Sequence, residues 1–483
     1  MWEETNMQKR GWIAGLLTLL LVLWCAWAGA EEMTLTAPAK LHPFQSSKLT
    51  LTLPAAGKLT ITVRDSYGEH KPLLRELPVR AGSVTVSYDA TSYEGMPLKA
   101  GNCTFTAKLT TAVGKSYTTQ TTVKMGTPAD KLEYALPRSD TYYLEQKERW
   151  KVDCGATGGG PAVLELFADE AMTLPAAKLT RSFSGKSMFT FTWDGTVGKK
   201  RIQPGDYWCR VYLKAQPEQA ITFTLHVEAG APPEEALRVN STLLPATDDP
   251  DELLEKFCEP LTVVDIDATA HQKIYAEPSE RSTVLGRVHG QSQGLQVFEV
   301  GKKFTRVGAW RHEDGAWIEG YVPTNVLKVI RPFEHYGIVV DKPNQELRVY
   351  EYGRLLGKMR ISTGLMERSN LSRETRAGAF LTTDRMITFE SHGAYYDYPI
   401  RIDGGNLLHQ VGYVPPKDGG FAPQLATLGQ KASAGCVRMD YRTDEEYNLN
   451  AYWVWTHIGW GVKVLVLDDE NARVERMEEL GIR

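Results

Sequence analysis

The sequence lacks an excess of basic residues, a nucleotide-binding motif and any low-complexity tract. Its 55 lysine and arginine residues are outnumbered by 59 aspartate and glutamate residues, which gives a formal net charge of −4. A nucleic-acid-binding protein normally carries a clustered positive charge, so no nucleic acid is expected as a partner. The absence of a P-loop, a dinucleotide fingerprint and heptad repeats argues against nucleotide-binding folds and coiled coils. With 483 residues the chain is too long for a single core, and about three or four domains are expected.

Cysteine is also scarce, and its spacing excludes one common use of it. Five of the six cysteines follow residue 30, namely Cys103, Cys154, Cys209, Cys258 and Cys436. They lie far apart and form no C-x-x-C pair, so a thiolate zinc site is not expected. In a protein outside the cytoplasm, an odd number of cysteines leaves at least one thiol without a disulfide partner in its own chain.

The N-terminus has the composition of an export signal. Lys9 and Arg10 precede an apolar run at residues 11–27, and the small residues Ala28, Gly29 and Ala30 follow. This order predicts a secretory signal at residues 1–30, cleaved after Ala30. The alternative is an uncleaved membrane anchor, since about 17 apolar residues can just span a bilayer. Either way, the rest of the chain is expected outside the cytoplasm, at the cell wall or cell surface.

Short runs of alternating polar and apolar residues fill the chain between residues 33 and 228. The runs at 49–53, 59–63 and 84–88 are separated by Gly, Pro and Asp turns, which is typical of an all-β sandwich. The motif Tyr88-Asp89-Ala90-Thr91 recurs as Trp193-Asp194-Gly195-Thr196. The two segments, 33–126 and 132–228, resemble tandem immunoglobulin-like (Ig-like) domains. In the second, the spacing of Cys154 and Cys209 leaves two alternatives, an intersheet disulfide or two reduced, buried thiols.

Two further segments precede the C-terminal part of the chain. Residues 229–260 are rich in proline and acidic side chains and show little periodicity, which predicts a linker. Residues 261–331 contain Ile274-Tyr275-Ala276-Glu277-Pro278 and Gly320-Tyr321-Val322-Pro323, and they resemble a bacterial SH3-like domain, a small β-barrel. Such domains accompany cell-wall enzymes, so the resemblance implies either binding of wall glycan or a spacing role.

A cysteine in a glycine-containing loop is the strongest candidate for chemistry. In Ser433-Ala434-Gly435-Cys436-Val437-Arg438, glycine allows a substrate to approach closely, and nearby amides can face a developing oxyanion. A nearby arginine can lower the pKa of the thiol or hold a substrate carboxylate. The thiol also needs a base, and the local sequence does not choose among ten histidines. The local alternative is a buried structural cysteine.

The wider pattern favours catalysis. Ser362-Thr363-Gly364, the segment 375–380, Leu407-Leu408-His409 and the loop at Cys436 occur in this order. Together they resemble the L,D-transpeptidase catalytic domain, or YkuD fold, over residues 335–468. A helix is expected at 443–458, and residues 469–483 form a charged tail. The whole chain is therefore expected to be mainly β and multidomain, with two Ig-like sandwiches, an SH3-like barrel and a C-terminal YkuD domain.

The resemblance implies a catalytic role for two residues. Cys436 attacks an acyl carbonyl and forms a thioester, and His409 deprotonates the thiol and later activates the incoming amine. The backbone carbonyl of Gln410 orients the imidazole, in place of the carboxylate of a Ser-His-Asp triad. The resemblance implies no metal and no organic cofactor.

The resemblance also implies supporting residues around the nucleophile. Ser433 supports the site by hydrogen bonding, and the amides of Gly435 and Cys436 are candidate oxyanion donors. Arg438 orders the site or contacts substrate, and Tyr398 is a candidate for a substrate-binding aromatic residue, with packing as its alternative. The long interval between His409 and Ser433 is expected to form a lid over the cleft, or else a passive surface insertion.

The implied reaction is acyl transfer on peptidoglycan stem peptides. Cys436 takes the acyl group of the third residue, a diamino acid, and the side-chain amine of a second stem resolves the thioester into a 3→3 cross-link. One alternative is an L,D-carboxypeptidase, in which water is the acceptor. Another is a non-catalytic scaffold that binds the wall through its other domains. A membrane is a partner only if the N-terminal segment stays uncleaved.

Overall fold

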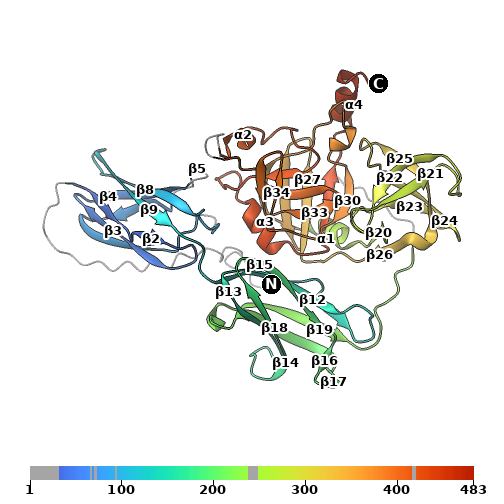
Figure 1. Ribbon diagram of the computed structural model, residues 1–483, viewed down its shortest axis with the longest axis horizontal. Coiled ribbons are helices and arrows are strands. Elements are labelled where there is room, and N and C mark those ends of the chain that lie inside the picture. The colour runs from blue at the N-terminus through green and yellow to red at the C-terminus, as the bar shows by residue number, and fades with distance from the viewer. Residues whose placement is uncertain are drawn as a thin grey trace, which may run out of the picture. The chain divides into compact units, whose positions relative to one another are not determined.

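The computed structural model describes residues 32–65, 68–69, 73–92, 95–237, 249–415 and 420–482. The export segment expected at residues 1–30 lies outside these described residues. Strands make up 51% of the structure and helices 9%, so the prediction of a mainly β, multidomain protein is confirmed (Figure 1). The chain divides into two compact units: the first contains the described residues up to Lys131 and those of the segment 414–421, and the second contains the described residues of 132–413 and 422–482. Every helix in the described part is too short or too polar to cross a membrane.

Two sheets share one apolar core in the first unit. One sheet has the strand order β1-β3-β7, and the other has the order β2-β9-β8-β4-β5 with β6 also paired to β4. Alternation explains the core, because Leu49, Leu51 and Leu53 of β3 are at most 1% exposed while the residues between them are partly exposed. The strands are β1 (Thr34–Thr36), β2 (Lys40–Leu41), β3 (Ser47–Leu53), β4 (Gly57–Asp65), β5 (Gly68–Glu69), β6 (Leu74–Val79), β7 (Gly82–Tyr88), β8 (Gly101–Thr110) and β9 (Ser116–Met125).

The second unit begins with another pair of sheets around a core. Their strand orders are β10-β12-β15 and β11-β19-β18-β13-β14, and β16 and β17 form a small ribbon. Trp150, Val152 and Leu164 are among the buried residues between the sheets. The strands are β10 (Lys131–Pro137), β11 (Thr141–Tyr143), β12 (Trp150–Thr157), β13 (Gly159–Phe167), β14 (Pro175–Ser184), β15 (Ser187–Trp193), β16 (Thr196–Val197), β17 (Lys200–Arg201), β18 (Gly205–Leu213) and β19 (Ile221–Glu228).

The repeated sequence motif forms the same turn in both sandwiches. In each copy the Asp carboxylate accepts a hydrogen bond from the backbone N–H of the Thr two residues later, at 3.3 Å in 89–91 and 3.1 Å in 194–196. The preceding aromatic residue donates to the carbonyl of that Thr, from Tyr88 Oη at 2.6 Å and from Trp193 Nε1 at 2.8 Å. The central residues Ala90 and Gly195 both have positive φ, 58° and 76°. The sequence repeat is therefore also a repeat of local structure.

The disulfide considered for Cys154 and Cys209 is not formed. Both residues are free, buried thiols, on β12 of one sheet and β18 of the other. Burial raises the pKa of both thiols, and that of Cys209 to about 12. The second of the two alternatives therefore holds, and both thiols act as apolar core residues.

The segment 229–260 is not a linker throughout its described part, because it contains helix α1 (Pro250–Cys258). Asp249 caps this helix by accepting hydrogen bonds from Asp251 N at 2.9 Å and Glu252 N at 3.1 Å. Leu253 and Phe257, four residues apart, form its buried face. A proline and a run of acidic residues thus mark the start of a helix here, since both are favourable in a first helical turn.

The SH3-like segment, residues 261–331, contains a five-stranded sheet of order β22-β21-β25-β24-β23 and a separate pair, β20 with β26. Leu261 and Val263 of β20 do not pack only with this sheet, because they share a core with Val339, Leu381 and Leu465 of the C-terminal sheet. The strands are β20 (Leu261–Val264), β21 (His271–Tyr275), β22 (Val284–His289), β23 (Gln296–Glu299), β24 (Phe304–Trp310), β25 (Trp317–Pro323) and β26 (Leu327–Ile330).

The C-terminal part is built on an eight-stranded sheet of order β30-β36-β27-β28-β29-β35-β34-β33. Two neighbouring pairs are parallel, β27 with β36 and β34 with β35. β27 and β36 are buried along almost their whole length, as expected for apolar strands covered on both faces. The strands are β27 (Tyr336–Asp341), β28 (Glu346–Glu351), β29 (Arg354–Ser362), β30 (Gly378–Leu381), β33 (Ile400–Asp403), β34 (Asn406–Gln410), β35 (Val437–Met439) and β36 (Lys463–Leu467), with β31 (Thr388–Ser391) and β32 (Ala394–Asp397) as a separate hairpin.

Three short helices accompany this sheet, and one differs from the prediction. The helix expected at 443–458 is shorter, because α3 (Ala451–His457) begins only after Asn450, whose side chain accepts a hydrogen bond from Trp453 N at 2.8 Å. The other two are α2 (Ala422–Leu425), in the segment between His409 and Ser433, and α4 (Glu470–Glu479), in the charged tail. Single 3₁₀ turns lie at Pro217–Gln219, Thr324–Val326 and Leu371–Arg373.

Candidate active site

Cys436 directly precedes β35, in a loop that is closed by its own hydrogen bonds. The Ser433 hydroxyl donates to the Cys436 carbonyl at 2.5 Å and accepts from the Gly435 N–H at 3.2 Å. Gly435 has a φ of 115°, and a Cβ at this position would lie 2.5 Å from Asn406 Oδ1. Only glycine satisfies both conditions, so the residue before the nucleophile is fixed by backbone geometry and by space.

The hydrogen bond from Gly435 N–H corrects one expectation. This amide was a candidate oxyanion donor, but in the structure it donates to the Ser433 hydroxyl within the loop. Gly435 and Ser433 therefore hold the shape of the loop that carries Cys436. The oxyanion role predicted for the Gly435 amide has no support in this arrangement.

His409 lies on β34, which runs parallel to β35. In this pairing Leu408 is opposite Val437 and His409 is opposite Arg438. Side chains of in-register neighbours point to the same face of a sheet, so His409 and Arg438 share a direction, and Cys436 is the residue directly before β35. The parallel pair thus places the imidazole and the guanidinium on one face of the sheet, and the nucleophile loop directly before β35.

The imidazole of His409 is enclosed and oriented. It is 2% exposed, its Nδ1 lies 2.7 Å from the Gln410 carbonyl oxygen, and the rings of Tyr396 and Phe389 meet it edge to face at 4.8 Å and 5.3 Å. Because a carbonyl oxygen only accepts, Nδ1 is the donor and Nε2 carries the lone pair. Burial lowers the pKa of His409 to about 4, against the opposing effect of the Gln410 carbonyl. At neutral pH the ring is therefore an uncharged base.

The Cys436 thiol is partly exposed, and it is protonated at rest. Its Sγ donates to the Gly405 carbonyl at 3.8 Å, in the turn between β33 and β34. Burial raises the pKa of the thiol, and the Leu407 backbone and the Arg438 charge offset this only in part. A thiol in this state becomes a nucleophile when a neighbouring base takes its proton.

Arg438 lies half-buried beside the nucleophile and contacts the segment between His409 and Ser433. One guanidinium nitrogen donates to Thr427 Oγ1 at 3.4 Å, and Tyr396 also interacts with the guanidinium. The Tyr396 hydroxyl in turn accepts a hydrogen bond from Gln424 Nε2 at 2.9 Å. Gln424 and Thr427 of the insertion therefore contact residues of the site, while residues 416–419 lie outside the described part.

Tyr398, expected as a substrate-binding residue, is not at this site. It is 1% exposed, and its ring packs against Tyr452 and Trp455 of α3 at 5.2 Å and 5.3 Å. Packing, the alternative reading, is correct. The aromatic side chains at His409 are instead those of Tyr396 and Phe389, which the sequence analysis did not select, although their place in two short runs flanking Gly393 was a signal of a hairpin.

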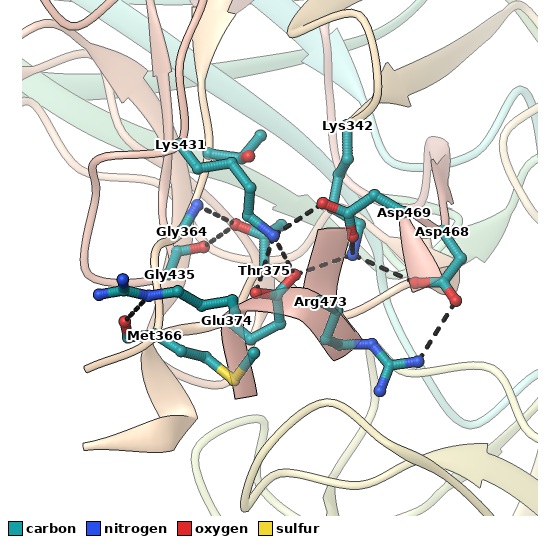
Figure 2. A network of polar contacts seen from close by, with 12 residues as sticks. Lys342, Gly364, Met366, Glu374, Thr375, Lys431, Gly435, Asp468, Asp469 and Arg473 are labelled. Carbon is teal, nitrogen blue, oxygen red and sulfur yellow. Dashed lines mark hydrogen bonds and ion pairs between the residues drawn. The ribbon is translucent and has the colours of Figure 1, made fainter. Parts of the chain in front are cut away.

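A buried polar network, shown in Figure 2, is hydrogen-bonded to the nucleophile loop at the Gly435 carbonyl. Thr375 Oγ1 donates to the Gly435 carbonyl at 2.8 Å and accepts from Gly364 N–H at 2.8 Å. The adjacent carboxylate of Glu374 lies 2.9 Å from both Lys342 Nζ and Lys431 Nζ. The sequence analysis placed Thr375 in a family segment but gave it no role, because the two glycines that it joins lie far from it in the sequence.

The same network reaches the end of β36. Asp469 lies 2.7 Å from both Lys342 Nζ and Lys431 Nζ, and the pKa of its carboxyl is lowered because the two cations outweigh the effect of burial. Lys342 is 2% exposed. Two lysines and two carboxylates therefore neutralise one another inside the protein, as buried charges require.

Comparisons with known proteins fit this geometry. Residues 335–457 match the YkuD family, the L,D-transpeptidase catalytic domain. No curated protein matches the chain. Solved structures with similarity include an L,D-transpeptidase from Mycobacterium tuberculosis H37Rv (15% identity, 44% of this chain and 82% of that chain, TM-score 0.23) and the L,D-transpeptidase from Xylanimonas cellulosilytica (21% identity, 27% and 60%, TM-score 0.19).

At such identities and TM-scores, the solved structures add nothing to the family match. The match itself covers β27 through α3, and therefore both parallel strands that carry His409 and Arg438, together with the loop at Cys436. Residues 335–457 of this chain are a YkuD-family L,D-transpeptidase catalytic domain.

Proposed function

We propose that this protein is an exported peptidoglycan L,D-transpeptidase that forms 3→3 cross-links through a thioester on Cys436. The parallel pairing of β34 with β35 carries the proposal, because it sets the uncharged, oriented imidazole of His409 on the strand beside the one that follows the partly exposed thiol of Cys436. Enzymes of this family act on cell-wall peptides, which supports peptidoglycan stem peptides as partners and a place of action outside the cytoplasm.

In the first half of the reaction, His409 Nε2 takes the proton of the Cys436 thiol. The sulfur then bonds to the carbonyl carbon of the third residue of a stem peptide, and the amide bond to the terminal D-alanine breaks. The leaving amine takes the proton from His409. Arg438, two residues after the nucleophile, is suited to bind a carboxylate of the peptide.

In the second half, an amine of a neighbouring stem attacks the thioester. His409 removes a proton from this amine, the new C–N bond forms, the C–S bond breaks, and the proton returns to the sulfur of Cys436. The same residues serve a water acceptor, which would make the protein an L,D-carboxypeptidase. The choice therefore depends on the acceptor side of the cleft.

The test is incubation of the purified protein with a disaccharide-tetrapeptide and mass spectrometry of the products. A cross-linked dimer is the expected product, whereas a tripeptide alone identifies the carboxypeptidase. The resemblance also predicts a covalent adduct of a carbapenem on Cys436. Cys436→Ala should abolish both activities, and a wild-type protein that forms neither products nor an adduct would favour the scaffold alternative.

A further inference from the structure

Three histidines of the SH3-like segment lie together beside the catalytic domain. His271 begins β21, His289 ends β22 as its cross-strand neighbour, and His312 follows β24. Their ring centroids are 4.4 to 4.7 Å apart, and one nitrogen of each lies within 4.8 Å of the others. We call these residues the three-histidine cluster.

Each ring offers a nitrogen that no described group occupies. His289 Nδ1 bonds to the Asp403 carboxylate at 2.8 Å, which leaves its Nε2 as an acceptor. The Nδ1 of His312 is buried and has no hydrogen-bond partner among the described residues. A buried polar atom without a partner is costly, and it is the kind of atom that a bound ion satisfies.

Metal ligation requires the neutral form of imidazole. Burial and then the Arg376 charge lower the pKa of His312 to about 4, and burial lowers the pKa of His271. Arg376 does not repel a cation as a free charge, because its guanidinium is paired with the buried Asp403 carboxylate. Burial opposes ionisation of Asp403, but Arg376 and His289 outweigh it and lower its pKa to about 2.

We propose that the three-histidine cluster is a binding site for a divalent transition-metal ion of the zinc type. Imidazole is a ligand suited to Zn²⁺. In zinc sites the second nitrogen of a ligating imidazole usually donates a hydrogen bond to a carboxylate, a carbonyl or water, as His289 Nδ1 does to Asp403. Zn–N bonds of about 2.0–2.1 Å place tetrahedral ligand nitrogens about 3.4 Å apart, so the rings close inward by about 1 Å or less on binding.

Solvent reaches the cluster, and the catalytic domain packs against it. His271 is exposed, so the cluster opens to solvent on that side. Gly404 lies against the His289 ring, and a Cβ there would come within 2.2 Å of Nε2. The ligands belong to the SH3-like segment, and the supporting carboxylate belongs to β33 of the catalytic domain. A bound ion would therefore fasten the two together at the turn whose Gly405 carbonyl contacts Cys436.

The test is Zn²⁺ binding by the untagged full chain, measured by competition with a chromogenic chelator and by metal analysis after dialysis. Every sample carries Cys436→Ala, so the partly exposed thiol is not a ligand. We expect one ion per chain in this parent protein. His271→Gln and His312→Gln should each weaken binding about tenfold or more, since even outer partners of metal ligands contribute factors of this size.

The matched control is His42→Gln, in the first sandwich, which should bind like the parent. The His42 ring hydrogen-bonds to a backbone carbonyl, that of Thr127, at 2.8 Å. Thermal unfolding in chelator shows whether each variant folds, and the exposed His271 is the position least able to disturb folding. Addition of Zn²⁺ should raise the unfolding temperature of the parent but not of His271→Gln. Absence of Zn²⁺ binding by the parent, or binding by both cluster variants that is as tight as that of the parent, would overturn the proposal.

Discussion

The environment of one residue, His409, predicts the pH range in which Cys436 reacts. Burial lowers the pKa of the imidazole to about 4, from an ordinary value near 6.5. The neutral ring is the base, so the rate of Cys436 acylation should fall only as the pH drops through about 4 and should stay unchanged through 6.5. The measurement is the second-order rate of carbapenem acylation across the acid range, with the adduct quantified by mass spectrometry.

The control for this prediction is a variant in which water can reach the imidazole of His409. Phe389→Ala removes one of the two rings that enclose His409, so the acid midpoint should move upward towards 6.5. A wild-type midpoint near 6.5, insensitive to this change, would mean that the imidazole is solvated and that the enclosure seen here does not control its charge.

Thr375 offers a second prediction at this scale. Thr375→Val keeps the shape of the side chain but removes the hydroxyl that joins Gly364 N–H to the Gly435 carbonyl, at a site 1% exposed. Each buried group left unpaired costs about 1–3 kcal/mol, so the free energy of unfolding in urea should decrease. The acylation rate should fall as well, because Gly435 directly precedes the nucleophile.

The matched control is Thr222→Val on the exposed side of β19, for which a change within about 0.5 kcal/mol is expected. If Thr375→Val lowered stability but left the acylation rate at 25 °C unchanged, the hydroxyl would be structural and would not position the loop.

Single residues also show which parts of the candidate site could be predicted from the sequence. His409, Gln410, Ser433 and Cys436 could be selected because they lie in short ordered motifs. The structure places the first two on β34 and the other two in the loop before β35, its parallel neighbour. Tyr398 was chosen wrongly, since which of the tyrosines at 395, 396 and 398 faces the imidazole depends on the register of the β31–β32 hairpin. One residue of register changes the face on which a side chain lies, and composition does not encode it.

Helix α1 lies in a segment that the sequence analysis interpreted as a linker. Its Phe257 is 1% exposed and packs on β27, where a Cβ on Gly337 would lie 2.3 Å from the phenyl ring. Phe257→Ala should therefore lower the free energy of unfolding of the catalytic domain by about 3–5 kcal/mol, as for other buried aromatic residues. Urea denaturation followed by loss of carbapenem acylation measures this effect on the domain itself.

Glu255→Ala, on the exposed face of the same helix, is the control and should change stability by no more than about 0.5 kcal/mol. Equal effects of the two substitutions would indicate that α1 is detached from the sheet in solution. The prediction matters for any shortened version of the protein, because a boundary drawn at residue 261 would remove this helix.

Elements were predictable where periodicity was strong and were missed where contacts are non-local. The alternating strands at 49–53 and 59–63 are present as expected, within β3 and β4. A nine-residue helix after a proline-rich stretch has only two apolar anchors, Leu253 and Phe257, and their partner surface lies on a sheet far along the chain. Likewise, the three-histidine cluster arises from two strands and the turn after a third, so no spacing rule could have found it.

At the scale of the whole molecule, the mainly β class and the C-terminal YkuD domain are confirmed, since both rest on patterns that run through long segments. The likeness of the other segments to Ig-like and SH3-like domains, and the domain boundaries, stay predictions. Contacts between segments could not be predicted from the sequence, because a surface that packs on a neighbouring segment has the same composition as an ordinary core. The second sandwich shows this with Tyr134 of β10.

Tyr134 is 2% exposed, and its ring meets Trp455 of α3 edge to face at 4.8 Å. Glu133, its neighbour, accepts a hydrogen bond from the Tyr452 hydroxyl at 3.1 Å. Trp455 also contacts Tyr398 and is fully buried, so one aromatic cluster belongs to both the sandwich and the catalytic domain. Tyr134→Ala should therefore destabilise the catalytic domain by about 3–5 kcal/mol, although the substitution lies in another sheet.

The readout is the temperature at which the protein loses the ability to form a carbapenem adduct on Cys436, which reports on the catalytic domain alone. Phe189→Ala is the comparison, because Phe189 is a core residue of the same sandwich that packs on Phe183 and Phe191. Both variants weaken the sandwich, but only Tyr134→Ala also removes a ring that packs on Trp455. Its adduct-forming activity should consequently be lost at the lower temperature. If Phe189→Ala were the more damaging of the two, the catalytic domain would depend on the sandwich as a folded body and not on the ring of Tyr134.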